Sequence, residues 1–275
     1  MSLFLCPICG APLTREAQVY QCPGGHSYDV AREGYVHLLP ANRKHSRQPG
    51  DDRDMVAARS RFLGGGWYGH LLETLRDLAL RYAPGETVFL DAGCGEGYYT
   101  AGVTEALEAA GRTVRSAGVD LSKYALKKAA RRSRETEFAV ASVYHLPVAD
   151  AAADLLLDCF APLAAEEYRR VVKPGGVFLY VVPGPQHLME MKDVLYENPY
   201  ENPEQQVAYG GFSYLDVVPA EQVLRLEDPQ AIQDLLGMTP YAWKTPQVGL
   251  ERLAALEALT VTAAFRIHVF RREAD

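Results

Sequence analysis

The sequence lacks several features that would assign it to a class at once. No apolar run approaches the roughly 18–20 residues that span a bilayer, so we expect no membrane partner. The N-terminus has neither a basic lead nor a long apolar stretch, which argues against a secretory signal and for a cytoplasmic protein. Only five of 275 residues are cysteine, too few for a disulfide scaffold. What remains is an average globular chain, 48% hydrophobic and 23% charged.

Basic charge is also scarce overall, but not in every part of the chain. The formal net charge is -7, whereas nucleic-acid binders are usually basic. Residues 1–61 hold eight basic and six acidic residues, a net +2, which leaves -9 for residues 62–275. Because salt limits the reach of distant charges to about 10 Å, a local basic segment can still contact phosphates. The best candidates are Arg43, Lys44, His45, Arg47 and Arg53.

Three of the cysteines lie close together in the first 22 residues. Cys6 and Cys9 form a C-x2-C pair, and Cys22 and His26 form a C-x3-H pair. Two close pairs, each on a turn rich in Pro and Gly, are typical of a closed tetrahedral zinc site, which is structural rather than catalytic. Such a short segment needs the metal to hold its fold. The alternatives are three free cysteines with a surface histidine, or His37 or His45 as a ligand.

The rest of the chain alternates between helical and strand patterns. We expect a helix from Met55, with Asp54 as N-cap, to the glycines at 64–66. Further helices are predicted over residues 71–81, 98–110, 123–134, 166–172, 229–236 and 250–259. Strands are predicted over residues 87–92, 114–120, 138–141, 153–159, 177–182 and 261–270. Alternating strands and helices indicate a parallel sheet covered on both faces.

A glycine-rich turn follows the first of these strands and opens a helix. It reads Asp91-Ala-Gly93-Cys-Gly95-Glu96-Gly, and the next strand ends in Asp120-Leu121. Dinucleotide enzymes also place a glycine turn here. The G-x-G-x-G spacing, the acidic residue before the turn and Asp120, suited to ribose hydroxyls, resemble the S-adenosylmethionine site of Rossmann-like methyltransferases. That fold contacts the adenine after the third strand, here at Ser142 and Val143.

Two other stretches admit two interpretations each. The basic run from Lys123 to Arg134 has no acidic residue within it, and is either a solvated helix face or a phosphate contact. The segment Met238 to Trp243 is either a platform that stacks an unpaired base or a lid on the core.

Together these motifs resemble the bacterial 23S rRNA guanine-N1 methyltransferases (rRNA large-subunit methyltransferase A), which include the tylosin-resistance enzymes. The resemblance spans nearly the whole chain, although residues 195–215 look divergent. It is carried by CPIC with Cys22 and His26, REGYVHLLP at 32–40, PGD at 49–51, DAGCGEGYYT at 91–100, VKPGG at 172–176, PGPQHLMEMK at 183–192 and MTPYAW at 238–243.

The resemblance implies an α/β protein with a Rossmann-like, class I methyltransferase sheet and a small N-terminal zinc-binding module. Residues 1–40 would form the zinc-binding RNA-recognition module, 41–66 a basic linker and helix, and 67–275 the methyltransferase domain. It implies cofactor contacts from Tyr68, Gly95, Glu96 and His187, beside Asp91, Gly93 and Asp120. It further implies a homodimer acting on one of two neighbouring guanines in a domain II hairpin of 23S rRNA, with macrolide resistance as a possible outcome.

The implied reaction is direct displacement, in which guanine N1 attacks the methyl group of the sulfonium. The protein mainly supplies position, and a base assists loss of the N1 proton. Asp158 and His187 are the candidates, and the sequence favours neither. Two rival functions are a small-molecule methyltransferase with a structural zinc and a non-catalytic RNA-binding protein on the same fold. The zinc pattern and basic linker argue against the first, and the intact glycine turn against the second.

Overall fold

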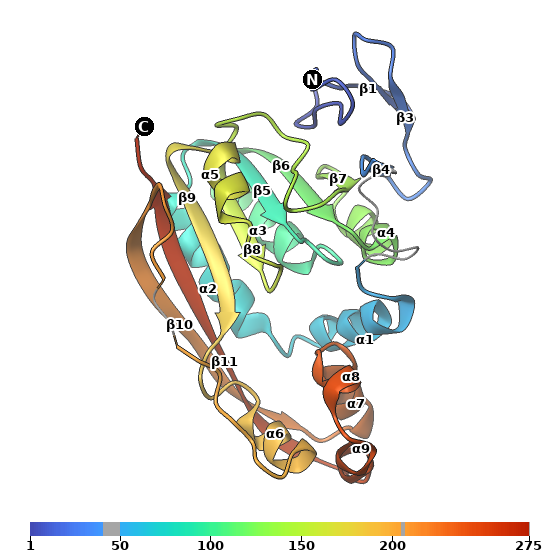
Figure 1. Ribbon diagram of the computed structural model, residues 1–275, viewed down its shortest axis with the longest axis vertical. Helices are drawn as coiled ribbons and strands as arrows, with labels where there is room; N and C mark the ends of the chain where they lie inside the picture. The colour runs from blue at the N-terminus through green and yellow to red at the C-terminus, as the bar shows by residue number, and fades with distance from the viewer. Residues whose placement is uncertain (41–49, 205–206, 275) are drawn as a thin grey trace.

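The computed structural model describes residues 1–40, 50–204 and 207–274, so the basic residues Arg43, Lys44, His45 and Arg47 lie outside the described residues. The N-terminal part contains four short strands, β1 (Thr14–Glu16), β2 (Val19–Gln21), β3 (Ser27–Asp29) and β4 (Tyr35–His37). β1, β2 and β3 form an antiparallel sheet of their own. Figure 1 shows this small sheet standing off the main body, beyond β4 and β7.

The main body follows the predicted alternation of strands and helices. Its strands are β5 (Glu86–Ala92), β6 (Thr113–Asp120), β7 (Glu137–Val140), β8 (Ala153–Cys159), β9 (Val172–Pro183), β10 (Phe212–Leu226) and β11 (Leu259–Arg272). Its helices are α1 (Arg53–Gly64), α2 (Gly69–Tyr82), α3 (Tyr98–Ala109), α4 (Lys123–Arg132), α5 (Ala165–Val171), α6 (Met189–Leu195), α7 (Pro229–Gly237), α8 (Tyr241–Lys244) and α9 (Gln247–Ala254).

The main sheet has eight strands in the order β10-β11-β9-β8-β5-β6-β7-β4. β5 lies in the middle and pairs in parallel with β6 and β8, so the carboxyl ends of these strands meet at one edge. The expectation of a wholly parallel sheet is wrong at one side, because β11 runs antiparallel to both β9 and β10. The long β10 was not predicted: its residues alternate poorly, since much of this edge strand is exposed.

The N-terminal part is joined to the main sheet rather than tethered beside it. β4 pairs in parallel with β7, with Val36 opposite Ala139. Phe4, Leu13 and Tyr20 are buried in the same hydrophobic cluster as the sheet residues that cover this face. Residues 1–40 and the sheet therefore share one core at their junction.

Two local expectations need correction. α1 begins earlier than predicted, because Asp52 rather than Asp54 is the N-cap: its Oδ1 accepts from the amides of Asp54 and Met55, both at 2.9 Å. The Pro-Gly-Gly segment at 174–176 does not separate α5 from the next strand, since β9 already starts at Val172. None of the helices in the described part of the chain has the length and apolar character needed to cross a membrane.

Candidate functional site

The four predicted metal ligands converge in the structure. Their ligand atoms all lie within 4.8 Å of one another. The Nδ1 atom of His26 lies 3.5 Å from the sulfur of Cys6 and 3.4 Å from that of Cys22, and the sulfurs of Cys9 and Cys22 are 3.6 Å apart. Zn–S bonds of about 2.3 Å in a tetrahedron place sulfurs roughly 3.8 Å apart, so these residues fit a Cys3His zinc site.

Tight turns bring each ligand pair together. The amide of Gly10 donates to the carbonyl of Cys6 at 2.8 Å, and the amide of Gly25 donates to the carbonyl of Cys22 at 3.0 Å. The hydroxyl of Tyr28 lies 3.0 Å from the sulfur of Cys6, where it can donate to a metal-bound thiolate. A zinc ion held by all four side chains would have no open coordination position for catalysis.

The second site lies at the carboxyl ends of β5, β6, β7 and β8, which we call the cofactor edge. The turn after β5 is tied to β6, because the amides of Gly93 and Cys94 both donate to the carbonyl of Val119, at 2.8 and 2.9 Å. Gly93 has a φ of 87°, and a Cβ there would collide with Ala161 of the turn after β8. Only glycine fits this backbone position.

The predicted ribose contact is already oriented. Asp120 Oδ2 accepts from the amide of Gly95 at 2.9 Å, and Oδ1 accepts from the amide of Ser122 at 2.7 Å. Burial raises the pKa of Asp120 to about 6, and these amide hydrogen bonds oppose the shift. The carboxylate is held by the backbone but keeps further lone pairs, which can accept from two hydroxyls.

Asp91 carries an unusual buried oxygen. Its Oδ2 accepts from the hydroxyl of Thr100 at 2.5 Å, but Oδ1 is buried without a hydrogen-bond partner in the described residues. Burial raises its pKa to about 7. An unpaired buried carboxylate oxygen carries a substantial desolvation penalty, so it is suited to a ligand donor such as the ammonium group of S-adenosylmethionine.

Two tyrosine hydroxyls are buried in the same way as this carboxylate oxygen. Those of Tyr68 and Tyr99 have no hydrogen-bond partner in the described part of the chain. Burial raises the pKa of Tyr99, and the neighbouring Cys159 and Tyr68 raise it further, whereas Arg59 lowers it. Tyr68, Cys159 and Arg59 therefore lie near Tyr99. Tyr99 was not singled out from the sequence, although it lies one residue beyond Tyr98 in the quoted DAGCGEGYYT segment.

Arg59 of α1 was missed altogether. Its guanidinium forms an ion pair with Asp51 and donates to the carbonyl of Met238 at 3.4 Å. One guanidinium nitrogen of Arg59 lies 3.9 Å from the position that a Cβ on Gly95 would occupy. A positive charge is therefore placed beside the glycine turn. The sequence gives no sign of this, because Arg59 lies 36 positions from Gly95.

The other predicted cofactor contacts are placed less directly. Glu96 is buried, and its Oε1 pairs with Arg132 of α4 at 2.9 Å. Leu121 packs beside the hydrophobic cluster at α4.

Arg131 pairs with Glu33 at 3.4 Å, so the basic run does have acidic partners, drawn from outside the helix. Two charges of α4 are thus paired inside the protein, and the helix is not a wholly solvated face.

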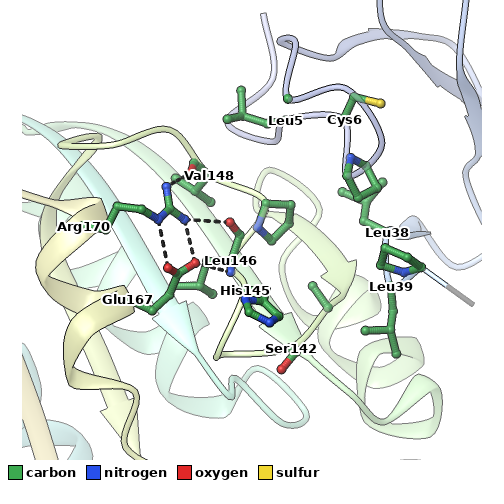
Figure 2. Close-up of a pocket in the computed structure, with 15 residues that line it drawn as sticks. Leu5, Cys6, Leu38, Leu39, Ser142, His145, Leu146, Val148, Glu167 and Arg170 are labelled. Carbon is green, nitrogen blue, oxygen red and sulfur yellow. Dashed lines mark hydrogen bonds and ion pairs between the residues drawn. The ribbon is translucent and has the colours of Figure 1, made fainter. Parts of the chain in front are cut away.

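Ser142 and Val143 lie at the end of β7, beside a pocket of about 280 Å³. Figure 2 shows Leu5, Leu38 and Leu39 from the N-terminal part facing Ser142 and His145 across it. The ion pair of Arg170 with Glu167, at 2.6 Å, closes one side. The glycine turn does not line this pocket, so the pocket lies at the β7 end of the cofactor edge, away from the turn.

Neither candidate base is free. Asp158 is fully buried, and its two oxygens accept from the amide of Ala161 at 2.9 Å and the hydroxyl of Tyr168 at 2.7 Å. Burial raises its pKa to about 7. His187 is also buried, its Nδ1 accepts from the amide of Ala264 at 3.3 Å, and burial lowers its pKa to about 3. These contacts favour positioning roles, and the assignment of a base stays a prediction.

Comparison with known proteins gives matches that cover the metal-ligand cluster and the glycine turn. The family model described as "RlmA, N-terminal", a zinc ribbon, matches residues 4–47, and a general methyltransferase domain model matches residues 90–180. A 23S rRNA (guanine(748)-N(1))-methyltransferase of Streptomyces fradiae is 35% identical over 95% of both chains. A relative from Micromonospora griseorubida is 36% identical over 97% of this chain and 96% of its own, and is provisionally named as a 23S rRNA (guanine-N(1)-)-methyltransferase.

Proposed function

Since this chain belongs to the family of 23S rRNA (guanine-N1)-methyltransferases, we propose that it transfers the methyl group of S-adenosylmethionine to N1 of a guanine in a domain II hairpin of 23S rRNA. The prediction of the family and of its fold from the sequence is confirmed. The proposal rests on a combination of observations. The chain is similar to members of this family over nearly its full length, and it also has a Cys3His cluster. Beside the glycine turn it has a buried carboxylate oxygen without a partner in the described residues.

The residues of the cofactor edge have distinct proposed roles. S-adenosylmethionine supplies an electrophilic methyl group on a good leaving group. Asp120 would bind the ribose hydroxyls, Asp91 the ammonium group and Arg59 the carboxylate. Tyr68 and His187 would line the space around the methyl group, and Gly93, Gly95 and Glu96 would shape the turn. Ser142, Val143 and Leu121 would contact the adenine.

The reacting guanine must leave its base pair, because N1 lies on the pairing edge. The chain then has to hold the ring so that N1 lies in line with the transferred methyl group. Orientation of this kind can supply several kcal/mol of the barrier on its own. Asp158 and Tyr168 would fix the turn that faces the guanine, and neither would take the N1 proton directly.

Residues 1–40 are proposed as the zinc-binding RNA-recognition module, 41–66 as the basic linker and helix, and 67–275 as the methyltransferase domain. The pocket between residues 1–40 and the end of β7 supports a shared RNA-binding surface. We further propose a homodimer acting in the cytoplasm, where ribosomes are modified. Light scattering of the purified zinc-loaded protein gives the oligomeric state, and a single-chain mass would contradict the dimer.

The function is tested by primer extension on 23S rRNA from cells with and without the gene. N1-methylguanine cannot pair normally, so we expect a gene-dependent stop beside one guanine of domain II. Complementation with Asp120→Asn should not restore the stop, while Asp193→Asn, an exposed control, should restore it. Absence of any gene-dependent stop contradicts the proposal. In that case, binding of S-adenosylmethionine in calorimetry would favour a small-molecule substrate, and no binding would favour a non-catalytic RNA-binding protein.

A further inference from the structure

Phe160 occupies an unfavourable position directly after β8. Its φ is 66°, a left-handed conformation that is rare for an aromatic residue. The residue is 46% exposed, whereas the other eight phenylalanines of the chain are at most 7% exposed. Backbone strain and an exposed ring both disfavour folding, and a structure that keeps both at one residue suggests a functional reason.

Neighbouring groups hold this residue in place. The amide of Phe160 donates to the carbonyl of Val181 at 3.3 Å. The next amide, of Ala161, donates to Asp158, whose other oxygen accepts from Tyr168. These bonds use a fully buried carboxylate to fix the turn, so the backbone of Phe160 cannot leave its left-handed conformation without straining them.

The turn that carries Phe160 abuts the cofactor edge. Ala161 packs so closely on Gly93 that no side chain fits between them. β8 pairs with β5, with Leu157 opposite Asp91, which brings the ends of the two strands together. Phe160 therefore directly precedes the residue that packs on the glycine turn, and it is exposed there.

The ring is also the exposed end of an aromatic cluster. Its centroid is 5.4 Å from that of Phe265, which is fully buried. Phe265 in turn contacts His187, with centroids 4.7 Å apart, and Tyr68, at 4.9 Å. Both of these are proposed cofactor contacts. The cluster thus joins two proposed cofactor contacts to Phe160 at the surface.

We propose that Phe160 is the stacking surface for the target guanine, an inference that rests on the proposed function. N1 loses its proton to solvent or to a nearby basic group, and the electron pair that then receives the methyl group lies in the plane of the guanine ring. A ring stacked on the face of the guanine fixes that plane and leaves the N1 edge free to point at the cofactor edge. Every base has such a face, and aromatic side chains are the usual partners of unpaired bases.

The test separates the ring from the backbone at this position. Phe160→Gly relieves the positive φ and removes the ring, Phe160→Leu keeps apolar bulk, and Phe160→Tyr keeps the ring. We expect kcat/KM on a 23S rRNA hairpin to fall about 10- to 100-fold in the Gly and Leu variants, from the typical strength of base stacking. The Tyr variant should stay within about threefold. The Kd for S-adenosylmethionine should change little in any of the three.

A second readout reports on stacking itself. With 2-aminopurine in place of the target guanine, fluorescence in the complex should be quenched by the wild-type and Tyr variants and recover in the Leu variant. Val248→Ala, at a 63% exposed site on α9, is the control for loss of an exposed apolar side chain. It should match the wild type in both measurements.

Several outcomes would overturn the inference. If Phe160→Gly is as active as the wild type, the ring has no role in methyl transfer. If Phe160→Leu weakens S-adenosylmethionine binding as much as it lowers kcat/KM, the ring acts through the cofactor site instead. If the wild type binds S-adenosylmethionine but methylates no rRNA, the proposed function itself fails, which is a distinct result from an active but insensitive enzyme.

Discussion

Residues 1–40 and the cofactor edge reach their order by different means. The first region has only short strands of three residues each and concentrates its chemistry in four metal ligands. The second stands on the middle of an eight-stranded sheet, and its turns are tied by backbone hydrogen bonds between β5 and β6. One region depends on a metal for local structure, whereas the other is supported by the core and leaves its polar groups available for a ligand.

The largest effect should come from removing the metal. Cys22→Ser or strong chelation should unfold residues 1–30, because structural zinc contributes on the order of 10 kcal/mol to such folds. Hydrogen exchange should become fast there, while the amides of β5 stay protected. Cys159→Ser, outside the ligand set, should retain one zinc per chain. Loss of protection in β5 as well would show that the two regions are not separable.

A smaller effect is expected at Arg59. Arg59→Met keeps the length of the side chain but removes the cation over the glycine turn, and we expect about tenfold weaker binding of S-adenosylmethionine, from the usual strength of a charge-assisted hydrogen bond. Calorimetry measures it. Arg76→Met, which breaks the pair with Glu73 on α2, is the matched control and should bind normally. An unchanged Kd in Arg59→Met would remove the residue from the cofactor site.

The buried carboxylates should give the cofactor edge its own pH dependence. The pKa of Asp91 is about 7 in the folded protein because of burial, against about 4 in an unfolded chain. The folded state therefore binds its proton more tightly, and the free energy of unfolding falls as pH rises from about 4 to about 7.

Melting temperatures of the ligand-free protein between pH 5 and pH 8 measure this slope. Asp91→Asn should reduce it and leave the contributions of Asp120 and Asp158, whose pKa values burial also raises, while Asp193→Asn, an exposed site, should leave it unchanged. Equal slopes in wild type and Asp91→Asn would mean that Asp91 does not carry the buried charge.

The smallest predicted effect concerns the junction of the two regions. The hydroxyl of the buried Tyr20 donates to Glu137 of β7 at 3.1 Å. Tyr20→Phe should lower the free energy of unfolding by about 1 kcal/mol, because Glu137 keeps its bonds to Ser2 and Leu3. Chemical denaturation measures the change. A loss of several kcal/mol would show that the junction, rather than zinc, holds residues 1–40.

The spacing of nearby residues in the sequence was sufficient to predict the zinc ligands, the glycine turn and most helix and strand positions. Cys6 and Cys9, or Asp91 and Gly93, are separated by two or three residues, so backbone geometry alone brings them together. The family resemblance added the substrate, which no local rule contains.

Only the tertiary structure decided which distant groups meet. It paired β4 with β7, made the far side of the sheet antiparallel, and drew acidic partners to α4 from other elements. It also placed Arg59 over Gly95, engaged both oxygens of Asp158, and left Phe160 exposed beside the glycine turn. Most of these contacts join residues far apart in the chain, and they depend on how whole elements pack, which side-chain type and short-range spacing do not determine.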